Sequence, residues 1–177
     1  ASQIISGRAK TKREYQDKVR DTNTALALSL HIANKLLTFK LHNVRSMMEV
    51  YGKQKAAYHK SLSTGVEAQL GPIDLEELEI LDLPVAELRT IAYDKLFLTL
   101  PLQSAVVELV ETVGLMNKSI ERRHVVLREM LKTNAHVDEA KKQILFAAPD
   151  AKGNVDGRYS SAMEGTWHYL NWCIHYS

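Results

Sequence analysis

Histidine and cysteine side chains near the C-terminus are the first candidates for metal binding in this sequence. His168, Cys173 and His175 fall within one expected helix. Ligands on one face of a helix lie three or four residues apart, whereas these three are separated by five and by two residues. A metal or haem site needs several converging ligands with supporting partners, so we expect none here. Because Cys173 is the single cysteine, disulfide scaffolds and zinc ribbons are also excluded.

Carboxylates at helical spacing are the next candidates. Glu108 and Glu111 lie three residues apart, as carboxylates do in di-iron bundles, but neither is followed by the histidine that such centres require three residues later. The loop that begins at Asp150 has Val155 where a calcium loop needs glycine. The sequence contains no nucleophile elbow, no glycine-rich phosphate loop and no His-Glu-x-x-His motif. We therefore expect a non-enzymatic protein without cofactor or metal.

His124 occupies an apolar position of an expected long helix. We interpret it as a core or boundary histidine with a hydrogen-bonded ring. The alternative is a contact that responds to pH, because burial can move the titration of histidine within the physiological range.

The elements that position these residues are helices, and the clearest is the first. Apolar residues recur at intervals of three or four from residue 15 to residue 51, and the mean spacing of 3.6 predicts one straight stripe that faces a bundle core. They are Tyr15, Val19, Thr22, Leu26, Leu30, Ala33, Leu37, Leu41, Val44, Met48 and Tyr51. A helix from about residue 11 to about residue 60 would be roughly 75 Å long. We expect it either to break near Gly52 or Ser29 or to project its basic N-terminal third.

Shorter helices are expected in the middle of the chain. Asp74 is expected to cap a short acidic helix over residues 75–81. Pro84 opens the next helix, over residues 85–96. Pro101 then marks a kink or a break.

A second long helix is predicted over residues 102–132, and a shorter one over residues 137–147. Ser161 and Glu164 form a capping-box pattern that is expected to start the last helix. Together the elements predict an all-α fold, an antiparallel helical bundle of about four main helices with a very long first helix. We expect a single domain over residues 1–177, with residues 1–20 as a projecting basic helical arm.

Charge is segregated along the chain although the net charge is only +2. Residues 1–60 carry twelve Lys or Arg against four Asp or Glu, whereas residues 61–88 carry seven acids and no base. Nucleic-acid-binding domains usually have a strongly positive total charge. We therefore favour matching of the two blocks within the fold or between subunits over nucleic-acid binding.

A basic cluster at the start of the first helix is the expected contact for an anionic partner. As a nucleic-acid arm it would bind without sequence specificity and lose affinity steeply with salt. As a segment beside a membrane anchor it would face lipid headgroups. The cluster consists of Arg8, Lys10, Lys12, Arg13, Lys18 and Arg20.

The last helix carries two apolar faces. One consists of Met163, Trp167, Leu170 and Ile174, and the opposite one of Tyr169, Trp172, Cys173 and Tyr176. The helix is either buried on both sides or turns its second face to a protein partner, a second copy or the headgroup zone of a membrane. Because chain ends are usually exposed, we name Tyr169, Trp172 and Tyr176 as candidate partner contacts.

These features predict a helical-bundle interaction module that works through protein contacts or self-association. The long first helix with a basic start resembles, in architecture alone, helical-bundle sensor domains that continue from a membrane helix. This favours the soluble sensor or adaptor part of an anchored bacterial protein, membrane-associated or extracytoplasmic. Ala1 fits either removal of an initiator methionine or a segment cut from behind a signal or anchor. The alternative is a self-assembling coat or filament subunit that binds nucleic acid through its basic N-terminal helix.

Overall fold

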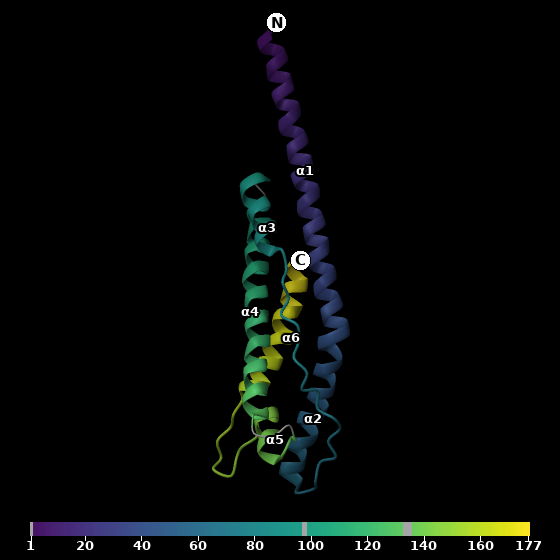
Figure 1. Ribbon diagram of the computed structural model, residues 1–177, viewed down its shortest axis with the longest axis vertical. Coiled ribbons are helices and arrows are strands. Elements are labelled where there is room, and N and C mark those ends of the chain that lie inside the picture. The colour runs from purple at the N-terminus through teal and green to yellow at the C-terminus, as the bar shows by residue number, and fades with distance from the viewer. Residues whose placement is uncertain (1, 97–98, 133–135) are drawn as a thin grey trace.

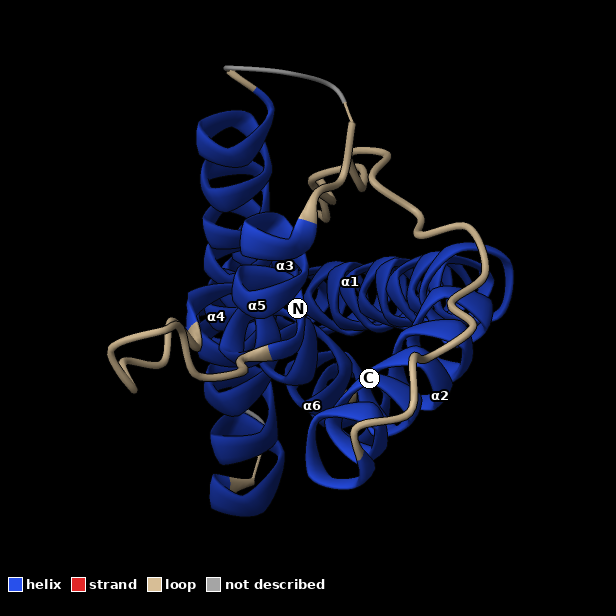
Figure 2. Ribbon diagram, turned by 90° about the horizontal axis from the view of Figure 1, so that it is seen from below, coloured by secondary structure: helices blue, strands red, loops and turns tan. Residues whose placement is uncertain are grey.

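The computed structural model describes residues 2–96, 99–132 and 136–177, with side chains from Lys10 onward. Over these ranges the chain is an all-α bundle, as the sequence predicts, and contains no β-strand (Figures 1 and 2). The helices are α1 (Ser2–Phe39), the π-helical turn η1 (Lys40–Val44), α2 (Arg45–Thr64), α3 (Val85–Thr90), the π-helical turn η2 (Ile91–Lys95), α4 (Leu100–Leu131), α5 (Glu139–Phe146) and α6 (Arg158–Tyr176).

Three long rods form the body of the bundle. α1 and α4 run in the same direction, and α6 returns between them, so that it is antiparallel to both (Figure 1). The N-terminal part of α1 projects beyond the other helices, whereas the C-terminus lies beside the second half of α1. α5 sits at the opposite end of the bundle, where its contacts with α2 and α6 close the core.

The first rod is longer and more continuous than expected. α1, η1 and α2 follow one another without a gap from Ser2 to Thr64. Of the two expected alternatives, the break near Gly52 or Ser29 is therefore wrong, since both residues lie inside regular helix, and the projection of the N-terminal part is what the structure has. The irregularity is η1, whose π turn holds one more residue than an α turn. That extra residue rotates the buried face of the helix at this point.

The face that α1 buries also differs from the prediction. Ile32, Leu36 and Phe39 are the α1 residues in the core, and most of the predicted stripe lies in solvent. Only its end, at Val44, Met48 and Tyr51, packs against the core. The physical reason is that α1 has two apolar stripes, and the one with spacing of four and three through Leu36 is turned toward α6 and α3.

The predicted acidic helix over residues 75–81 is absent, because residues 65–83 form an extended segment. Arg123, which is fully buried, donates from Nη1 to the carbonyl oxygen of Glu76 at 2.6 Å and from Nη2 to that of Asp74 at 3.2 Å. Asn117 donates to the carbonyl oxygen of Leu81 and accepts from its backbone N–H, at 2.9 and 3.2 Å. Backbone groups that a helix would pair internally are thus paired with α4 side chains.

The ends of the later helices follow local signals with one exception. α4 begins at Leu100 with Pro101 in its first turn, and the side chain of Asp138 accepts from the backbone N–H of Lys141 at the start of α5. α6 begins at Arg158, so the prediction that Ser161 caps it is wrong. Asp156 accepts the backbone N–H of Arg158 instead, at 3.1 Å, and thereby extends the helix by one turn.

α2 is fastened to α5 by two tyrosines. The hydroxyl of Tyr51 donates to the carbonyl oxygen of Leu145 at 2.9 Å, and that of Tyr58 donates to the carboxylate of Glu139. Burial raises the pKa of Tyr51 to about 12, so its hydroxyl stays protonated and remains a donor. Phe146 packs between the two rings, with centroids 6.0 and 5.3 Å away.

α4 and α6 approach closely because small residues face each other. A Cβ atom added to Gly165 would lie 2.8 Å from Oγ of Ser119, which is shorter than van der Waals contact. Gly114, in the exposed middle of α4, has no neighbour within 4 Å of an added Cβ. The two glycines therefore test helix propensity with and without a packing constraint.

We predict that Gly165→Ala destabilises the protein by about 1 kcal/mol, because overpacking outweighs the gain in helix propensity. Gly114→Ala is the matched control and is expected to stabilise by roughly 0.5–1 kcal/mol. Adding Ser119→Ala to Gly165→Ala restores stability, since it removes the clashing hydroxyl. Urea unfolding followed by circular dichroism measures all four proteins. Equal stabilisation by both alanines would contradict close packing of α4 on α6.

We further predict that Arg123→Met lowers the free energy of unfolding by about 2–4 kcal/mol, because two part-buried carbonyl oxygens lose their donors. Arg122→Met changes an exposed neighbour on the same helix and is expected to cost less than about 0.5 kcal/mol. Limited proteolysis adds a local readout, in which residues 65–83 are cleaved faster in the Arg123 variant alone. Protection of that segment equal to wild type would refute its attachment through Arg123.

Candidate interaction surface

The three metal-ligand candidates near the C-terminus do not converge on one point, as their spacing predicts. Cys173 is fully buried, whereas His168 and His175 are exposed. Burial raises the pKa of the Cys173 thiol to about 12, so the thiolate that metals bind is strongly disfavoured. Among the residues that the structure describes, no group of three or more His, Cys, Asp or Glu side chains is arranged to hold a metal ion.

The aromatic face of α6 is only partly free. Of the three candidate contacts, Trp172 is 46% exposed, while Tyr169 and Tyr176 are half-buried against the core. Cys173 belongs to the buried face, so its assignment to the outer face is wrong. The Trp172 ring lies 5.0 Å from that of His168 and 6.3 Å from that of Tyr176. These rings follow one another along the outer side of α6.

α1 covers the neighbouring side of α6. Nζ of Lys40 donates to Oδ1 of Asn171 at 2.6 Å and lies 5.1 Å from the centroid of the Trp167 ring. Lower on the bundle, Nζ of Lys55 donates to Oγ of Ser160 at 2.6 Å and to Glu164 at 2.9 Å. Lys55 holds the pKa of the Glu164 carboxyl below its usual value. These two lysines orient the α1–α2 rod against α6.

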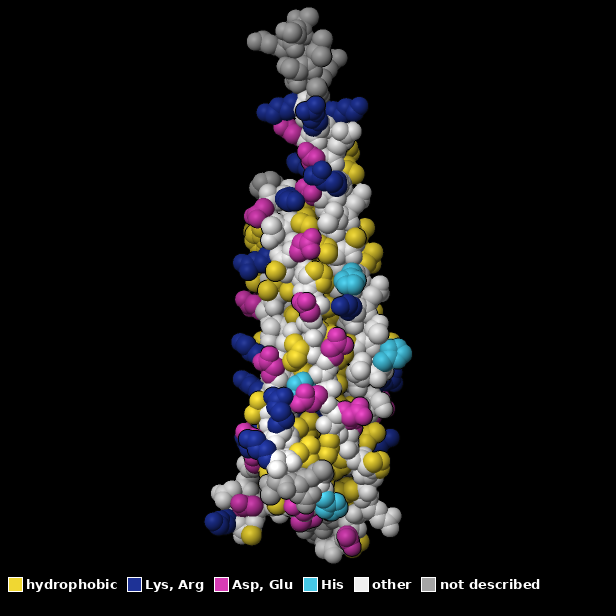
Figure 3. All heavy atoms as spheres, viewed as in Figure 1, with side chains coloured by type: hydrophobic (Ala, Val, Ile, Leu, Met, Phe, Trp, Pro, Cys, Tyr) yellow, Lys and Arg dark blue, Asp and Glu magenta, His cyan; other side chains and the backbone are white. Residues whose placement is uncertain are grey.

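The basic cluster lies on the projecting part of α1 (Figure 3). Its described members are all exposed: Lys10, Lys12, Arg13, Lys18 and Arg20. The side chain of Arg8 lies outside the described residues. Some of this charge is matched locally, because Lys10 lies 4.0 Å from Glu14 and Arg20 lies 3.2 Å from Asp17. The cluster therefore reaches solvent well away from the acidic segment 65–83.

An exposed apolar stripe runs along α1 and into η1. Six large side chains are between 41% and 71% exposed. They form what we call the α1 stripe: Tyr15, Val19, Leu26, Leu30, Leu37 and Leu41. At 3.6 residues per turn, the centre of this stripe is turned by about 130° from the buried face through Leu36. Figure 3 shows hydrophobic side chains along the outer edge of α1.

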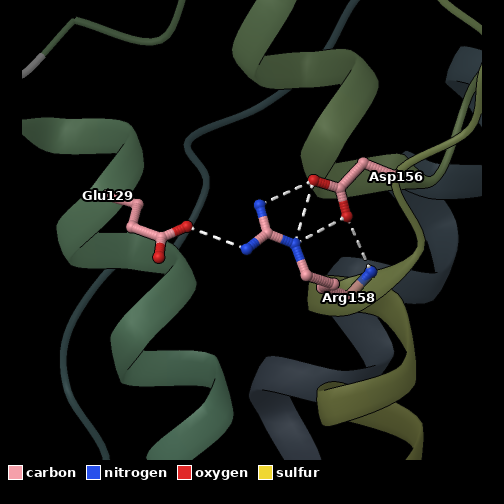
Figure 4. Close-up of polar contacts among 3 residues, drawn as sticks. All are labelled: Glu129, Asp156 and Arg158. Carbon is pink, nitrogen blue, oxygen red and sulfur yellow. Dashed lines mark hydrogen bonds and ion pairs between the residues drawn. The ribbon is translucent and has the colours of Figure 1, made fainter.

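A hollow lies on the surface between α4 and α6. It has a volume of ≈ 610 Å³, with Val125, Val126 and Ala162 among its apolar lining residues and Arg122 and Arg158 among its cations. The Arg158 guanidinium is already engaged, since it lies 2.9 Å from Glu129 and 2.9 Å from Asp156 (Figure 4).

These two carboxylates raise the pKa of Arg158, and Arg158 in turn lowers the pKa of Asp156. The cluster joins α4 to the start of α6 and engages the guanidinium of Arg158. We therefore assign it a structural role.

One buried polar residue of α4, Arg123, is not identified by the sequence patterns. Leu109, Val113, Met116 and Ile120 are spaced by four and three, and the same rhythm continues to Arg123. The three–four spacing predicts His124 at this position of the register instead of Arg123. Arg123 is a charged residue at a core position of a helix. That pattern is the signal that could have identified it as the residue that holds segment 65–83.

Comparison of the chain with protein-family models, with curated proteins and with solved structures finds no match. Of the helices that the structure describes, none is both long and apolar enough to cross a membrane.

His124 is 6% exposed, and its Nε2 has no hydrogen-bond partner among the described residues. Burial lowers its pKa, which the nearby Arg123 and Arg128 reinforce, while Glu77 and the backbone of Leu78 oppose the shift. Protonation therefore favours the unfolded chain, in which histidine titrates near 6.5. Stability is accordingly retained above this pH and lost as the pH falls below it.

We predict that wild-type stability drops by up to about 1 kcal/mol between about pH 7.5 and pH 5.5 because of this group. His124→Gln is expected to flatten that dependence, whereas His31→Gln, at an exposed position of α1, should leave it unchanged. Urea unfolding at both pH values measures the difference. An identical pH dependence in wild type and His124→Gln would contradict this account.

Proposed function

We propose that this chain is a helical-bundle interaction module that acts through protein contacts, with the α1 stripe as its docking surface. The observation that carries the proposal is that six large apolar side chains stay exposed on one helix while a different face of that helix supplies the core. Contiguous exposed apolar surface rimmed by polar residues is typical of interaction sites. An amphipathic helix that docks through such a face is a common mode of recognition.

The same architecture suits the sensor or adaptor part of an anchored bacterial protein. The α1–η1–α2 rod is continuous over residues 2–64, so a displacement at the basic arm would be carried to the far end of the bundle. In this proposal the arm lies beside an anionic surface, and the exposed Trp172 on α6 supplies a second, smaller contact. Both features serve binding and positioning, in keeping with a non-enzymatic role.

A coat or filament subunit that binds nucleic acid is the second candidate. The observation in its favour is that the described cations of the arm are exposed on a part of α1 that projects beyond the other helices. Binding of this kind would be recognised by retention on duplex DNA or RNA that weakens steeply with salt, with a slope set by the number of phosphates contacted.

To test the first proposal, we would replace Leu26 and Leu30 together by Glu and compare the immobilised chains in extracts of the source cells. Wild type is expected to retain specific proteins, the untagged chain itself included, and the stripe variant to lose them, because charge is costly in an apolar interface. The matched control replaces Thr24 and His31, which are exposed elsewhere on α1, and is expected to retain the same proteins. Circular dichroism checks the fold of each variant. Retention of an unchanged set by the stripe variant would refute the proposal.

A further inference from the structure

We infer that the α1 stripe docks on the α1 stripe of a second copy of this chain, antiparallel to it and related by a two-fold axis near residue 28. This inference rests on the proposed function, in which the α1 stripe is a protein-docking surface, and it names the partner.

The spacing of the stripe is self-complementary. Its residues pair symmetrically about position 28: Tyr15 with Leu41, Val19 with Leu37, and Leu26 with Leu30. In a two-fold interface each residue i meets residue j of the other copy, and j meets i. An antiparallel pair centred on residue 28 therefore brings every large apolar side chain of one stripe opposite one of the other, with none left facing solvent.

The stripe is also straight enough to be covered along its length. Leu26 and Leu37 follow Tyr15 at steps of eleven, a period of about 3.67 residues per turn that keeps the stripe nearly parallel to the helix axis. Residues 15–41 span about 40 Å. The stripe ends where η1 rotates the helix and the next position of the repeat, Met48, packs against the core. Two helices can thus stay in contact from one end of the stripe to the other.

Repulsion between the basic arms is weaker in the antiparallel orientation than in the parallel one. A parallel pair would place the exposed cations of residues 10–20 beside the same cations of the other copy, which is unfavourable. An antiparallel pair places them beside residues 36–46. Those residues carry two cations, Lys40 and Arg45, and no acid, and Arg45 lies 3.0 Å from Glu49.

The area available is sufficient for a stable pair. Six side chains that are about half exposed offer on the order of 600 Å² per copy, and about 1,200 Å² for the pair is at the lower end for specific interfaces. Because the stripe is turned about 130° from the buried face of α1, each bundle points away from the partner helix. Neither bundle blocks the other.

Sedimentation equilibrium of the full chain across protein concentrations tests the pairing. We expect a monomer–dimer equilibrium, and replacement of Leu26 and Leu30 by Glu is expected to raise the dissociation constant about 100-fold or more. The control with Glu at positions 24 and 31 should dimerise like wild type. A wild-type dimer that the stripe variant forms equally well would overturn the inference.

Cysteine cross-linking tests the orientation. In the antiparallel pair, Val19→Cys of one copy faces Leu37→Cys of the other, so a mixture of the two single variants forms a disulfide under mild oxidation. Val19→Cys alone stays uncross-linked, because its two copies are about 27 Å apart along the helices. Cross-linking of Val19→Cys alone would show a parallel pair and refute the inference. Wild type, whose Cys173 is buried, measures the background.

Other occupants give different outcomes. A chain that stays monomeric, yet loses binding to another identified protein when Leu26 and Leu30 are replaced, would overturn self-pairing and leave the proposed function intact. A monomer that binds phosphatidylcholine–phosphatidylserine vesicles through the stripe, with no protein retained, would overturn both in favour of a membrane surface. Stripe variants that behave as wild type in all three assays would also overturn both.

Discussion

The orientation of α1 on the bundle is the constraint from which the surface of this protein follows. One helix carries two apolar stripes, and a single neighbouring core can cover only one of them. Ile32, Leu36 and Phe39 pack inward, so the stripe centred on Leu26 and Leu30 stays in solvent. The energetic gain of burying apolar area remains available on that outer face, which is why the α1 stripe is the surface we associate with function.

A second constraint acts through one buried charge. Arg123 sits in the core of α4, where an uncompensated guanidinium would be strongly unfavourable. It is compensated by the carbonyl oxygens of Asp74 and Glu76 and by the hydroxyl of Tyr159. The same contacts hold residues 65–83 extended against the bundle. Most of the acidic block of the sequence is therefore displayed along the body, far from the basic arm at the tip of α1.

The separation of these surfaces bears on how the module would work. The arm, the α1 stripe and the exposed Trp172 face different surroundings but are joined through helices that pack on one core. Lys40 and Lys55 tie the first rod to α6 by direct hydrogen bonds. In the proposed function, a partner bound along the α1 stripe would thus affect α6 through these hydrogen bonds. It would affect α4 through the close contact at Gly165.

The sequence by itself determined the long helices, the interruption before Pro101 and the start of α5 at Asp138, because periodicity, proline and capping are local signals. It also identified every residue of the α1 stripe, although it assigned them to the core. Only the tertiary structure decided which stripe of α1 is buried, that residues 65–83 are extended, and that Arg123 is their anchor. Periodicity identifies an apolar face of a helix but not the element that packs against it. The donors that replace helical hydrogen bonds in residues 65–83 come from α4, more than thirty residues away in the sequence.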